Sequence, residues 1–332
     1  MKKTLKFSVL FILLLLFSLF ILKPSEVIAT STDRFVGEVK LGGDTIGIQL
    51  KTKVEVVGKY EVTTKDGKVK PWNKSNILEG DHIYSINDNI INNNDELNEL
   101  VRSTTDNNLD LVLIRDDEMI NTQIEVVKNA NDVNSIGLYI KDHLSGIGTL
   151  TFINLKNNKY GALGHSVSDS LSTGKLYESS VRGIKKAIKG VPGEKFATLS
   201  PTEIGTIEKN NDIGIFGEYN KKNDNEIVNV VKSSYVHKGN AQIVTVLEGN
   251  IIKKYDIKII EVEKQNSSNV KGIKFKVIDE ELINTSGGII QGMSGSPIIQ
   301  DGNLIGAVSH VVVNDPLIGF GVFAEWMYYE TL

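Results

Sequence analysis

Apolar and polar residues alternate over short stretches along most of this 332-residue chain. Turns rich in Gly, Asn and Asp separate these stretches, a pattern typical of strands joined by tight loops. Strands are predicted at 109–114, 120–126, 136–140, 148–155, 159–163, 241–247, 255–263, 271–277, 297–299, 304–313 and 319–323. The chain is therefore predicted to be mainly β.

One helix is expected among the strands. Leu97, Leu100 and Val101 stand at i, i+3 and i+4, an apolar stripe that Asn94 can cap. The polar stretch 128–132 has no apolar periodicity and indicates a boundary. We predict one module at 33–128 and a second at 133–332, where many short strands favour a pair of β-barrels.

The N-terminus has the pattern of an export segment. Lys2, Lys3 and Lys6 precede the apolar run 7–22, and small or tolerated residues follow up to Ala29. The run is shorter than the ~20 residues usually needed to cross a bilayer. We predict a signal peptide or membrane anchor at 1–29. Either one would place the rest of the chain outside the cytoplasm.

Composition narrows the chemistry. The chain has no cysteine, which excludes a thiol nucleophile, a disulfide and a thiolate metal site. Its five histidines show no metal-ligand spacing, so neither a metal nor another cofactor is expected. Without residues 1–29 the chain loses four lysines and one glutamate, which leaves 33 basic and 40 acidic side chains. This net charge of −7 argues against a nucleic-acid partner.

The run Gly-Met-Ser-Gly-Ser-Pro at 292–297 places Ser294 in a glycine turn. The flanking glycines let the backbone fold sharply, so the amides of Gly292 and Ser294 can converge on a developing oxyanion. The alternative is a plain glycine-serine turn between strands. We interpret Ser294 as a nucleophile. Ser296 carries the nearest competing hydroxyl, but only Ser294 has the Gly-x-Ser-Gly placement.

A serine nucleophile needs a base. His165 ends the run Tyr-Gly-Ala-Leu-Gly-His, and a histidine pKa near 6.5 suits a group that accepts and returns a proton. A structural histidine after a strand is the alternative. The third member should be a carboxylate that orients the imidazole. The aspartates of the C-terminal half are candidates among which spacing does not choose: Asp169, Asp212, Asp256, Asp279 and Asp315. Asp279 gives the chymotrypsin-like chain order His, Asp, Ser.

Three strings resemble the SpoIVB peptidase family: Tyr-Gly-Ala-Leu-Gly-His at 160–165, Gly-Gly-Ile-Ile-Gln-Gly-Met-Ser-Gly-Ser-Pro-Ile-Ile at 287–299, and Gly-Ala-Val-Ser-His-Val-Val-Val-Asn-Asp-Pro at 306–316. The resemblance extends over essentially the whole chain. It implies a PDZ domain followed by a chymotrypsin-like double β-barrel serine peptidase domain. It also implies His165, Asp279 and Ser294 as the catalytic residues.

The resemblance further implies a sporulation signalling endopeptidase exported to the space between the two membranes around the forespore. Such an enzyme cleaves a membrane-bound regulatory protein, and itself near the N-terminus, and so triggers sigma-factor processing by an intramembrane protease. Met293 stands where digestive relatives carry an aspartate, so activation must differ. The strand at 306–310 resembles the one that pairs with substrate, which makes Ser309, His310 and Val311 expected substrate neighbours.

The first module resembles a PDZ domain through a glycine-containing loop at 42–48, the string 77–87 and the helix. On that resemblance Ile46, Gly47 and Ile48 form the loop that receives a peptide carboxylate, and Leu97 and Val101 line the pocket. C-terminal or internal peptide tails are then expected partners. The alternative is that these apolar residues only fill a small core.

Two other classes of function remain open. A non-catalytic PDZ scaffold with a degenerate peptidase fold would keep the peptide groove, yet it would not react with a serine-directed fluorophosphonate. A structural envelope protein would bind neither the fluorophosphonate nor C-terminal peptides.

Overall fold

The computed structural model describes residues 31–167 and 173–332, and residues 36–332 form one compact unit. The predicted signal or anchor at 1–29 lies outside the described residues, as does Asp169. No helix in the described ranges is long and apolar enough to span a bilayer.

The chain is mainly β, as predicted, with 57% of the described residues in strands and 11% in helices. The strands are β1 (Phe35–Leu41), β2 (Thr45–Lys59), β3 (Val62–Thr64), β4 (Gly67–Val69), β5 (His82–Ile86), β6 (Asn89–Ile90), β7 (Asn108–Arg115), β8 (Glu118–Glu125), β9 (Val127–Lys128), β10 (Asn134–Ser135), β11 (Leu138–Asn154), β12 (Lys159–Ala162), β13 (Gly174–Lys185), β14 (Glu194–Ile207), β15 (Lys209–Asn211), β16 (Gly214–Glu218), β17 (Ile227–Val231), β18 (Gly239–Val246), β19 (Ile252–Val262), β20 (Ile273–Val277), β21 (Pro297–Gln300), β22 (Asn303–Val312) and β23 (Asp315–Phe323). The helices are η1 (Ser31–Arg34), η2 (Pro71–Lys74), α2 (Asn94–Ser103), η3 (Ser233–Tyr235), α3 (Glu280–Ser286) and α4 (Ala324–Tyr329).

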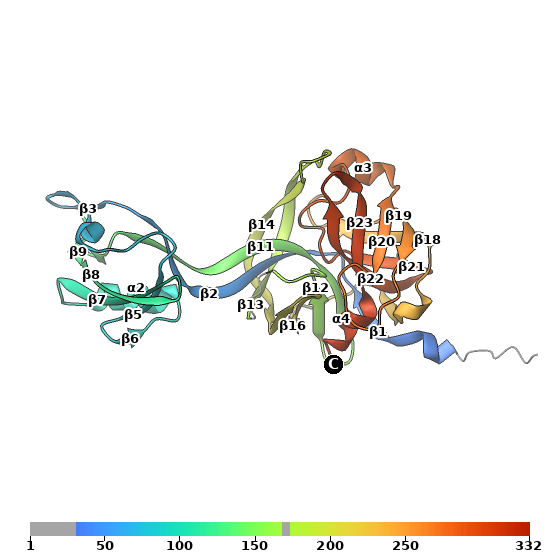
Figure 1. The fold of residues 1–332 in the computed structure, drawn as a ribbon, viewed down its shortest axis with the longest axis horizontal. Coiled ribbons are helices and arrows are strands. Elements are labelled where there is room, and N and C mark those ends of the chain that lie inside the picture. The colour runs from blue at the N-terminus through green and yellow to red at the C-terminus, as the bar shows by residue number, and fades with distance from the viewer. Residues whose placement is uncertain (1–30, 168–172) are drawn as a thin grey trace, which may run out of the picture. The chain divides into compact units, whose positions relative to one another are not determined.

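A first barrel closes through successive strand pairs (Figure 1). The order is β2, β13, β14, β16, β12 and β11, and β11 pairs again with β2. Apolar residues of these strands fill its interior, among them Ile48, Leu150, Tyr160 and Ile215, each at most 2% exposed. Burial of this apolar surface is the main force that holds such a ring together.

A second barrel closes in the same way. Its strands pair in the order β18, β19, β20, β23, β22 and β21, and β21 pairs again with β18. In β20, Ile273, Phe275 and Val277 are buried while Lys274 and Lys276 are not. This period of two is the signal from which the strand was predicted.

A small module with its own core lies along the chain between the barrel portions of β2 and β11. Its core draws on residues from Val54 to Leu138 and includes Leu97 and Val101 of α2. The helix was predicted correctly, but its cap was misplaced by one residue. Asn93, rather than Asn94, accepts the amide of Glu96 at 2.9 Å.

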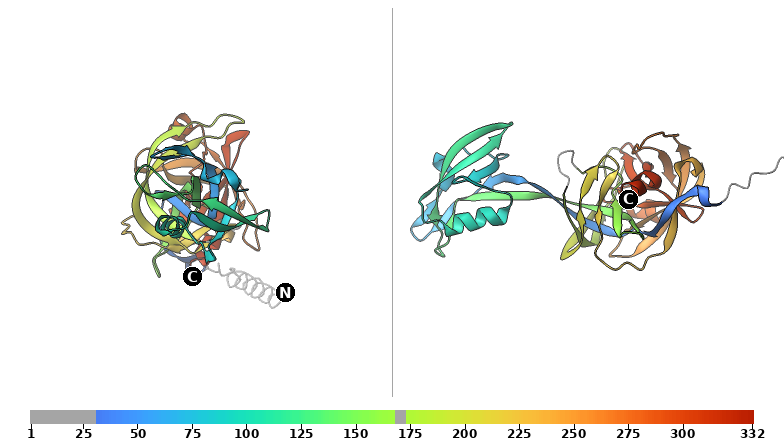
Figure 2. Two further views of the ribbon diagram at one scale, coloured as in Figure 1. Left: turned by 90° about the vertical axis from the view of Figure 1, so that its left-hand side faces the viewer. Right: turned by 90° about the horizontal axis from the view of Figure 1, so that it is seen from below.

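The long strands β2 and β11 pair antiparallel from Thr45 opposite Thr149 to Lys59 opposite Leu138 and run side by side in Figure 2. Sequence patterns predicted two strands, at 136–140 and 148–155, where the structure has one. The strand continues through Ser145 and Gly146 because both stay paired with β2. The module boundaries also differ from the predicted ones. β1 and the start of β2 pair with barrel strands, while Leu138 packs in the small module.

The predicted carboxylate loop is wrong. Ile46, Gly47 and Ile48 lie inside β2, which pairs with β11 on one edge and β13 on the other. No peptide carboxylate can reach amides that are already bonded within a sheet. The glycine has a packing reason instead, because a Cβ on Gly47 would lie 2.5 Å from Cγ of Leu199.

Candidate active site

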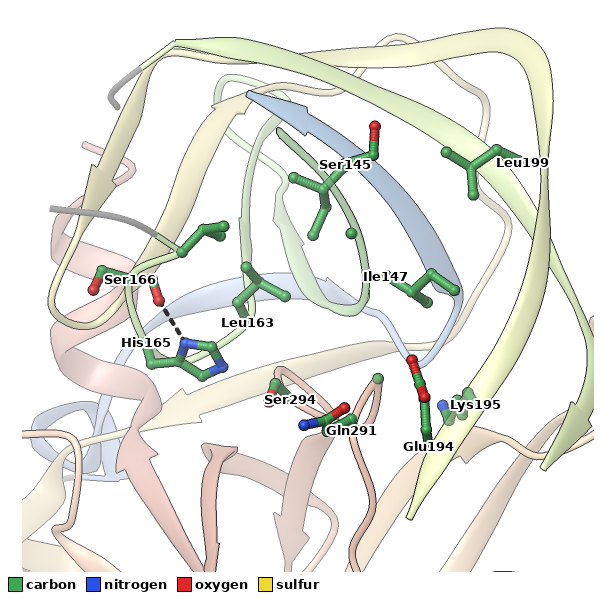
Figure 3. Close-up of a pocket in the computed structure, with 14 residues that line it drawn as sticks. Ser145, Ile147, Leu163, His165, Ser166, Glu194, Lys195, Leu199, Gln291 and Ser294 are labelled. Atoms are coloured by element: carbon green, nitrogen blue, oxygen red, sulfur yellow. Dashed lines mark hydrogen bonds between the residues drawn. The ribbon is translucent and has the colours of Figure 1, made fainter. Parts of the chain in front are cut away.

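A cleft of about 640 Å³ contains two of the three residues predicted from the sequence to be catalytic, His165 and Ser294. His165 comes from the connection after β12 in the first barrel, and Ser294 from the turn before β21 in the second (Figure 3). The two lie 129 positions apart in the sequence. The structure therefore brings these two side chains to one cleft, although no hydrogen bond joins them.

The turn that carries Ser294 requires glycine on both sides. Gly292 and Gly295 both have φ of +91°, a region that side chains disfavour. A Cβ on Gly295 would lie 2.1 Å from the carbonyl oxygen of Thr149. Strand β11 can therefore approach the turn that carries Ser294 only because this position has no side chain.

The backbone around Ser294 is held by two buried threonines of β11. The hydroxyl of Thr149 donates to the carbonyl of Gly292 at 2.8 Å, and its amide donates to the carbonyl of Ser294 at 2.9 Å. The hydroxyl of Thr151 donates to the carbonyl of Gly295 at 2.7 Å. In contrast, the amides of Gly292 and Ser294 donate to no atom of the described residues. Both remain available to the oxygen of an attacked carbonyl.

The two threonines were not among the site residues predicted from the sequence. Both are 0% exposed, and both stand in an uncharged run at 147–153 in which residues of either face are buried. A strand without polar alternation is the sign of burial on two sides. That sign was present, but it does not say which hydroxyl meets which carbonyl.

His165 is oriented by its own local backbone. Its Nδ1 lies 2.7 Å from the carbonyl oxygen of Ser166, the contact drawn in Figure 3. A carbonyl can only accept, so Nδ1 carries the proton of the neutral ring. Nε2 is then the basic nitrogen, as a proton acceptor for a serine hydroxyl requires.

A second histidine lies against the first. The rings of His165 and His310 are 5.7 Å apart between centroids and tilted by 54°. Burial lowers the pKa of His310, and the nearby charges of His165 and Lys271 lower it further. Two positive charges at this separation repel, so one ring of the pair is favoured to stay neutral.

The structure does not bring Asp279 to His165. The carboxylate of Asp279 caps α3, where Oδ1 accepts the amide of Leu282 at 3.0 Å. Its other oxygen accepts the amide of Asp256 at 3.2 Å. Asp279 is also not among the residues that line the cleft. Its catalytic role therefore stays a prediction.

One edge of the predicted substrate strand has no pairing partner within residues 31–167 and 173–332. His310 and Val311 pair with β23 on one side of β22, whereas the pairing of β22 with β21 ends at Ala307. Ser309 is buried, and its hydroxyl donates to the carbonyl of Val270. Any contact of Ser309 with a substrate would therefore use its backbone.

A separate cavity of about 180 Å³ in the small module is lined by Leu97 and Val101 of α2, together with Leu138 and Ile140. Leu97 and Val101 are 2% and 4% exposed, so they form its floor. Within residues 31–167 and 173–332, no three His, Asp or Glu side chains gather in a way that could hold a metal ion.

Comparison with known protein families matches residues 132–328, more than half of the chain, to the family SpoIVB peptidase S55. A search of curated proteins finds no match. The matched residues include both His165 and Ser294 and the strands that position them. The chain therefore belongs to the SpoIVB peptidase family and is a serine peptidase.

Proposed function

We propose that the chain is a chymotrypsin-like sporulation endopeptidase in which His165 deprotonates Ser294. One observation carries the proposal: the imidazole and the hydroxyl line one cleft, beside two backbone amides that bond to no described residue. The two closed barrels support the proposal of a chymotrypsin-like fold, since each barrel contributes one of these two side chains.

The reaction follows from this geometry. Nε2 of His165 takes the hydroxyl proton as Ser294 attacks the peptide carbonyl, and the amides of Gly292 and Ser294 hold the resulting oxyanion. The protonated imidazole then gives its proton to the leaving amine, which leaves an acyl-serine. Water, deprotonated by the same imidazole, hydrolyses that ester and frees the enzyme.

Asp279 is proposed as the carboxylate that stabilises the protonated form of His165. Two arguments support this assignment: the family resemblance, and the position of Asp279 between His165 and Ser294 in the order of the chain. Because the carboxylate caps α3 in the structure, the role requires it to leave the cap. We propose that this release accompanies activation.

The substrate strand is proposed to add to the unpaired edge of β22. Backbone groups of His310 and Val311 would pair there with the residues that precede the cut bond, and Ser309 would contribute its carbonyl. The proposed substrate is a membrane-bound regulatory protein in the space between the membranes around the forespore. Cleavage near its own N-terminus is proposed as a second reaction. Both rest on the family resemblance, and export rests on the pattern at 1–29.

The small module is proposed to be a PDZ domain that binds peptide tails. Support comes from its strands, its α-helix α2 and the cavity lined by Leu97 and Val101. Isothermal titration with one peptide, once with a free and once with an amidated C-terminus, tests this. Binding of both forms is expected, because the amides at 46–48 that were predicted to receive a carboxylate are paired within β2, and failure of both forms to bind would refute the proposal.

Covalent labelling tests the peptidase proposal. Purified full-length chain in detergent is incubated with a fluorophosphonate, and the modified residue is located by mass spectrometry. We expect an adduct on Ser294 in the wild-type chain and none in Ser294→Ala, whose unfolding temperature should be unchanged. Adduct formation at another serine would overturn the site. The Ser296→Ala variant serves as the matched control and should still be labelled at Ser294, because Ser296 itself should not react.

A further inference from the structure

Lys195 is a buried lysine at the start of β14 to which the proposed reaction assigns no task. Its side chain is 1% exposed, yet it lines the cleft together with His165 and Ser294. Its Nζ lies 2.8 Å from the hydroxyl of Thr245, which is 0% exposed on β18. No ion pair joins Lys195 to a carboxylate among the described residues.

The backbone of Lys195 fixes the direction of one oxyanion amide. Its N–H donates to the carbonyl of Gln291 at 3.0 Å, and the amide of Gln291 donates to the carbonyl of Gly193 at 3.0 Å. In a trans peptide the carbonyl and the N–H point to opposite sides. Because Lys195 holds the Gln291 carbonyl, the N–H of Gly292 is directed away from β14. Rotation of this peptide would break the bond to Lys195.

The side chain of Lys195 supports the same peptide from beside Gly292. An added Cβ on Gly292 would lie 3.1 to 3.3 Å from Cβ, Cγ and Cδ of Lys195. The aliphatic chain thus passes close to the glycine and ends on Thr245 of the second barrel. Lys195 connects the first-barrel strand β14, the oxyanion turn and β18 through one residue.

A lysine amine is energetically unfavourable at this buried position beside Gly292. Burial lowers the pKa of Lys195 to about 7, because the charged form loses its water without gaining a carboxylate. Methionine has similar length and no charge, and it would occupy an apolar interior at lower cost. A lysine here is therefore better explained by what its amine holds than by packing.

We propose that Lys195 is a positioning residue that, anchored on Thr245, keeps the Gln291–Gly292 peptide with its N–H available to the oxyanion. This inference rests on the proposed peptidase function. It assigns Lys195 no contact with the substrate. Its effect is on the transition state, because the oxyanion needs the Gly292 amide more than the bound substrate does.

The test measures fluorophosphonate labelling of the full-length chain, since phosphonylation of the serine also develops charge on an oxygen in this hole. The rate at saturating probe and the half-saturating probe concentration are obtained for the wild type, Lys195→Met and Thr245→Val. Lys175→Met is the matched control, because Lys175 is half exposed on β13 and pairs with Glu203.

For Lys195→Met we expect the saturating rate to fall about tenfold, since complete loss of one oxyanion donor costs about 10²-fold to 10³-fold. The half-saturating concentration should change less than twofold, and the unfolding temperature should stay equal or rise. Thr245→Val should lower the rate similarly but also lower the unfolding temperature, because it leaves the amine without a partner. Lys175→Met should match the wild type.

A wild-type saturating rate in Lys195→Met would overturn the proposal. So would a lower rate explained by a matching fall in unfolding temperature, since that would indicate a purely structural role. Failure of the wild-type chain to label at Ser294 is a different result. It would overturn the peptidase proposal, and the positioning role with it.

Discussion

The two sides of the cleft are built differently. On the serine side, neighbouring strands hold the backbone: carbonyls of the turn accept from Thr149 and Thr151, and the amide of Gly295 donates to Val308 at 2.7 Å. On the histidine side, the ring of His165 is held by the carbonyl of the next residue, Ser166.

This difference separates the proposed oxyanion hole from the proposed base. The hole consists of backbone groups held by neighbouring strands, β11 and β14 among them, so it is formed whenever both barrels are folded. The base depends on one side chain and one short-range bond, and the carboxylate proposed to support it is engaged elsewhere. Activation should therefore change the histidine side far more than the serine side.

The largest effect is expected from Asp279→Asn, which removes the proposed carboxylate support of His165 and leaves the serine side of the cleft unchanged. Asparagine caps a helix about as well as aspartate, so α3 and the unfolding temperature should be preserved. If the carboxylate serves His165, labelling of Ser294 should fall by about 10⁴-fold. Labelling kinetics and thermal unfolding of the same samples give both values.

A wild-type rate in Asp279→Asn would show that Asp279 only caps the helix. His165 would then be supported by the Ser166 carbonyl alone. The matched control is Asp256→Asn, because Asp256 was a candidate of equal standing in the sequence and is a direct neighbour of Asp279.

The next effect is expected from Gly292→Ala on the serine side. Its φ of +91° is strained for alanine, and the new Cβ would lie 3.1 Å from Lys195. Turning the peptide to relieve this removes an oxyanion donor, so labelling should slow by about 10²-fold to 10³-fold. Gly302→Ala is the control, since Gly302 has φ of +74° with nothing within 4 Å of its added Cβ. Equal slowing in both variants would contradict a local effect.

A smaller effect is expected from substitution of the two buried threonines of β11. Thr149→Val leaves the carbonyl of Gly292 without its hydroxyl donor, and Thr151→Val does the same to Gly295. Each should cost about 1 to 3 kcal/mol of unfolding free energy. Only Thr149→Val should also slow labelling, by about tenfold, because Gly292 belongs to the oxyanion hole. Denaturant unfolding beside labelling kinetics checks this, and equal rates for both variants would contradict it.

The smallest effect concerns stability against pH rather than rate. The pKa of Lys195 is about 7 in the folded chain, against 10.5 for an ordinary lysine. Between these values the unfolded chain holds a proton that the folded chain has released, so the unfolding free energy rises with pH across this window. Lys195→Met should remove that rise. Unfolding temperatures of both proteins at pH 7 and pH 9 measure it, and identical slopes would show that the amine keeps its proton.

Sequence patterns predicted the elements whose burial alternates simply. In β20 every second residue is buried, and α2 buries Leu97 and Val101, so the period alone identifies each element. The hairpin of β13 and β14 was missed because many of its residues are exposed or half-buried, and it is held by pairing with distant strands. The segment 46–48 was assigned to a loop on the resemblance to a PDZ domain, whereas it lies inside β2, where the packing of Leu199 requires a glycine at position 47.

For the site, the sequence determined which residue types carry the chemistry. A glycine turn around Ser294 and a histidine after a strand limit the reaction to a few classes, because local geometry and ordinary pKa values are properties of short segments. Only the tertiary structure decided that β11 supplies the threonines, that Lys195 lies beside Gly292, and that Asp279 accepts the amide of Asp256. These contacts join residues up to 144 positions apart, as between Thr151 and Gly295. Their partners are set by barrel closure and strand register, which no short stretch of sequence contains.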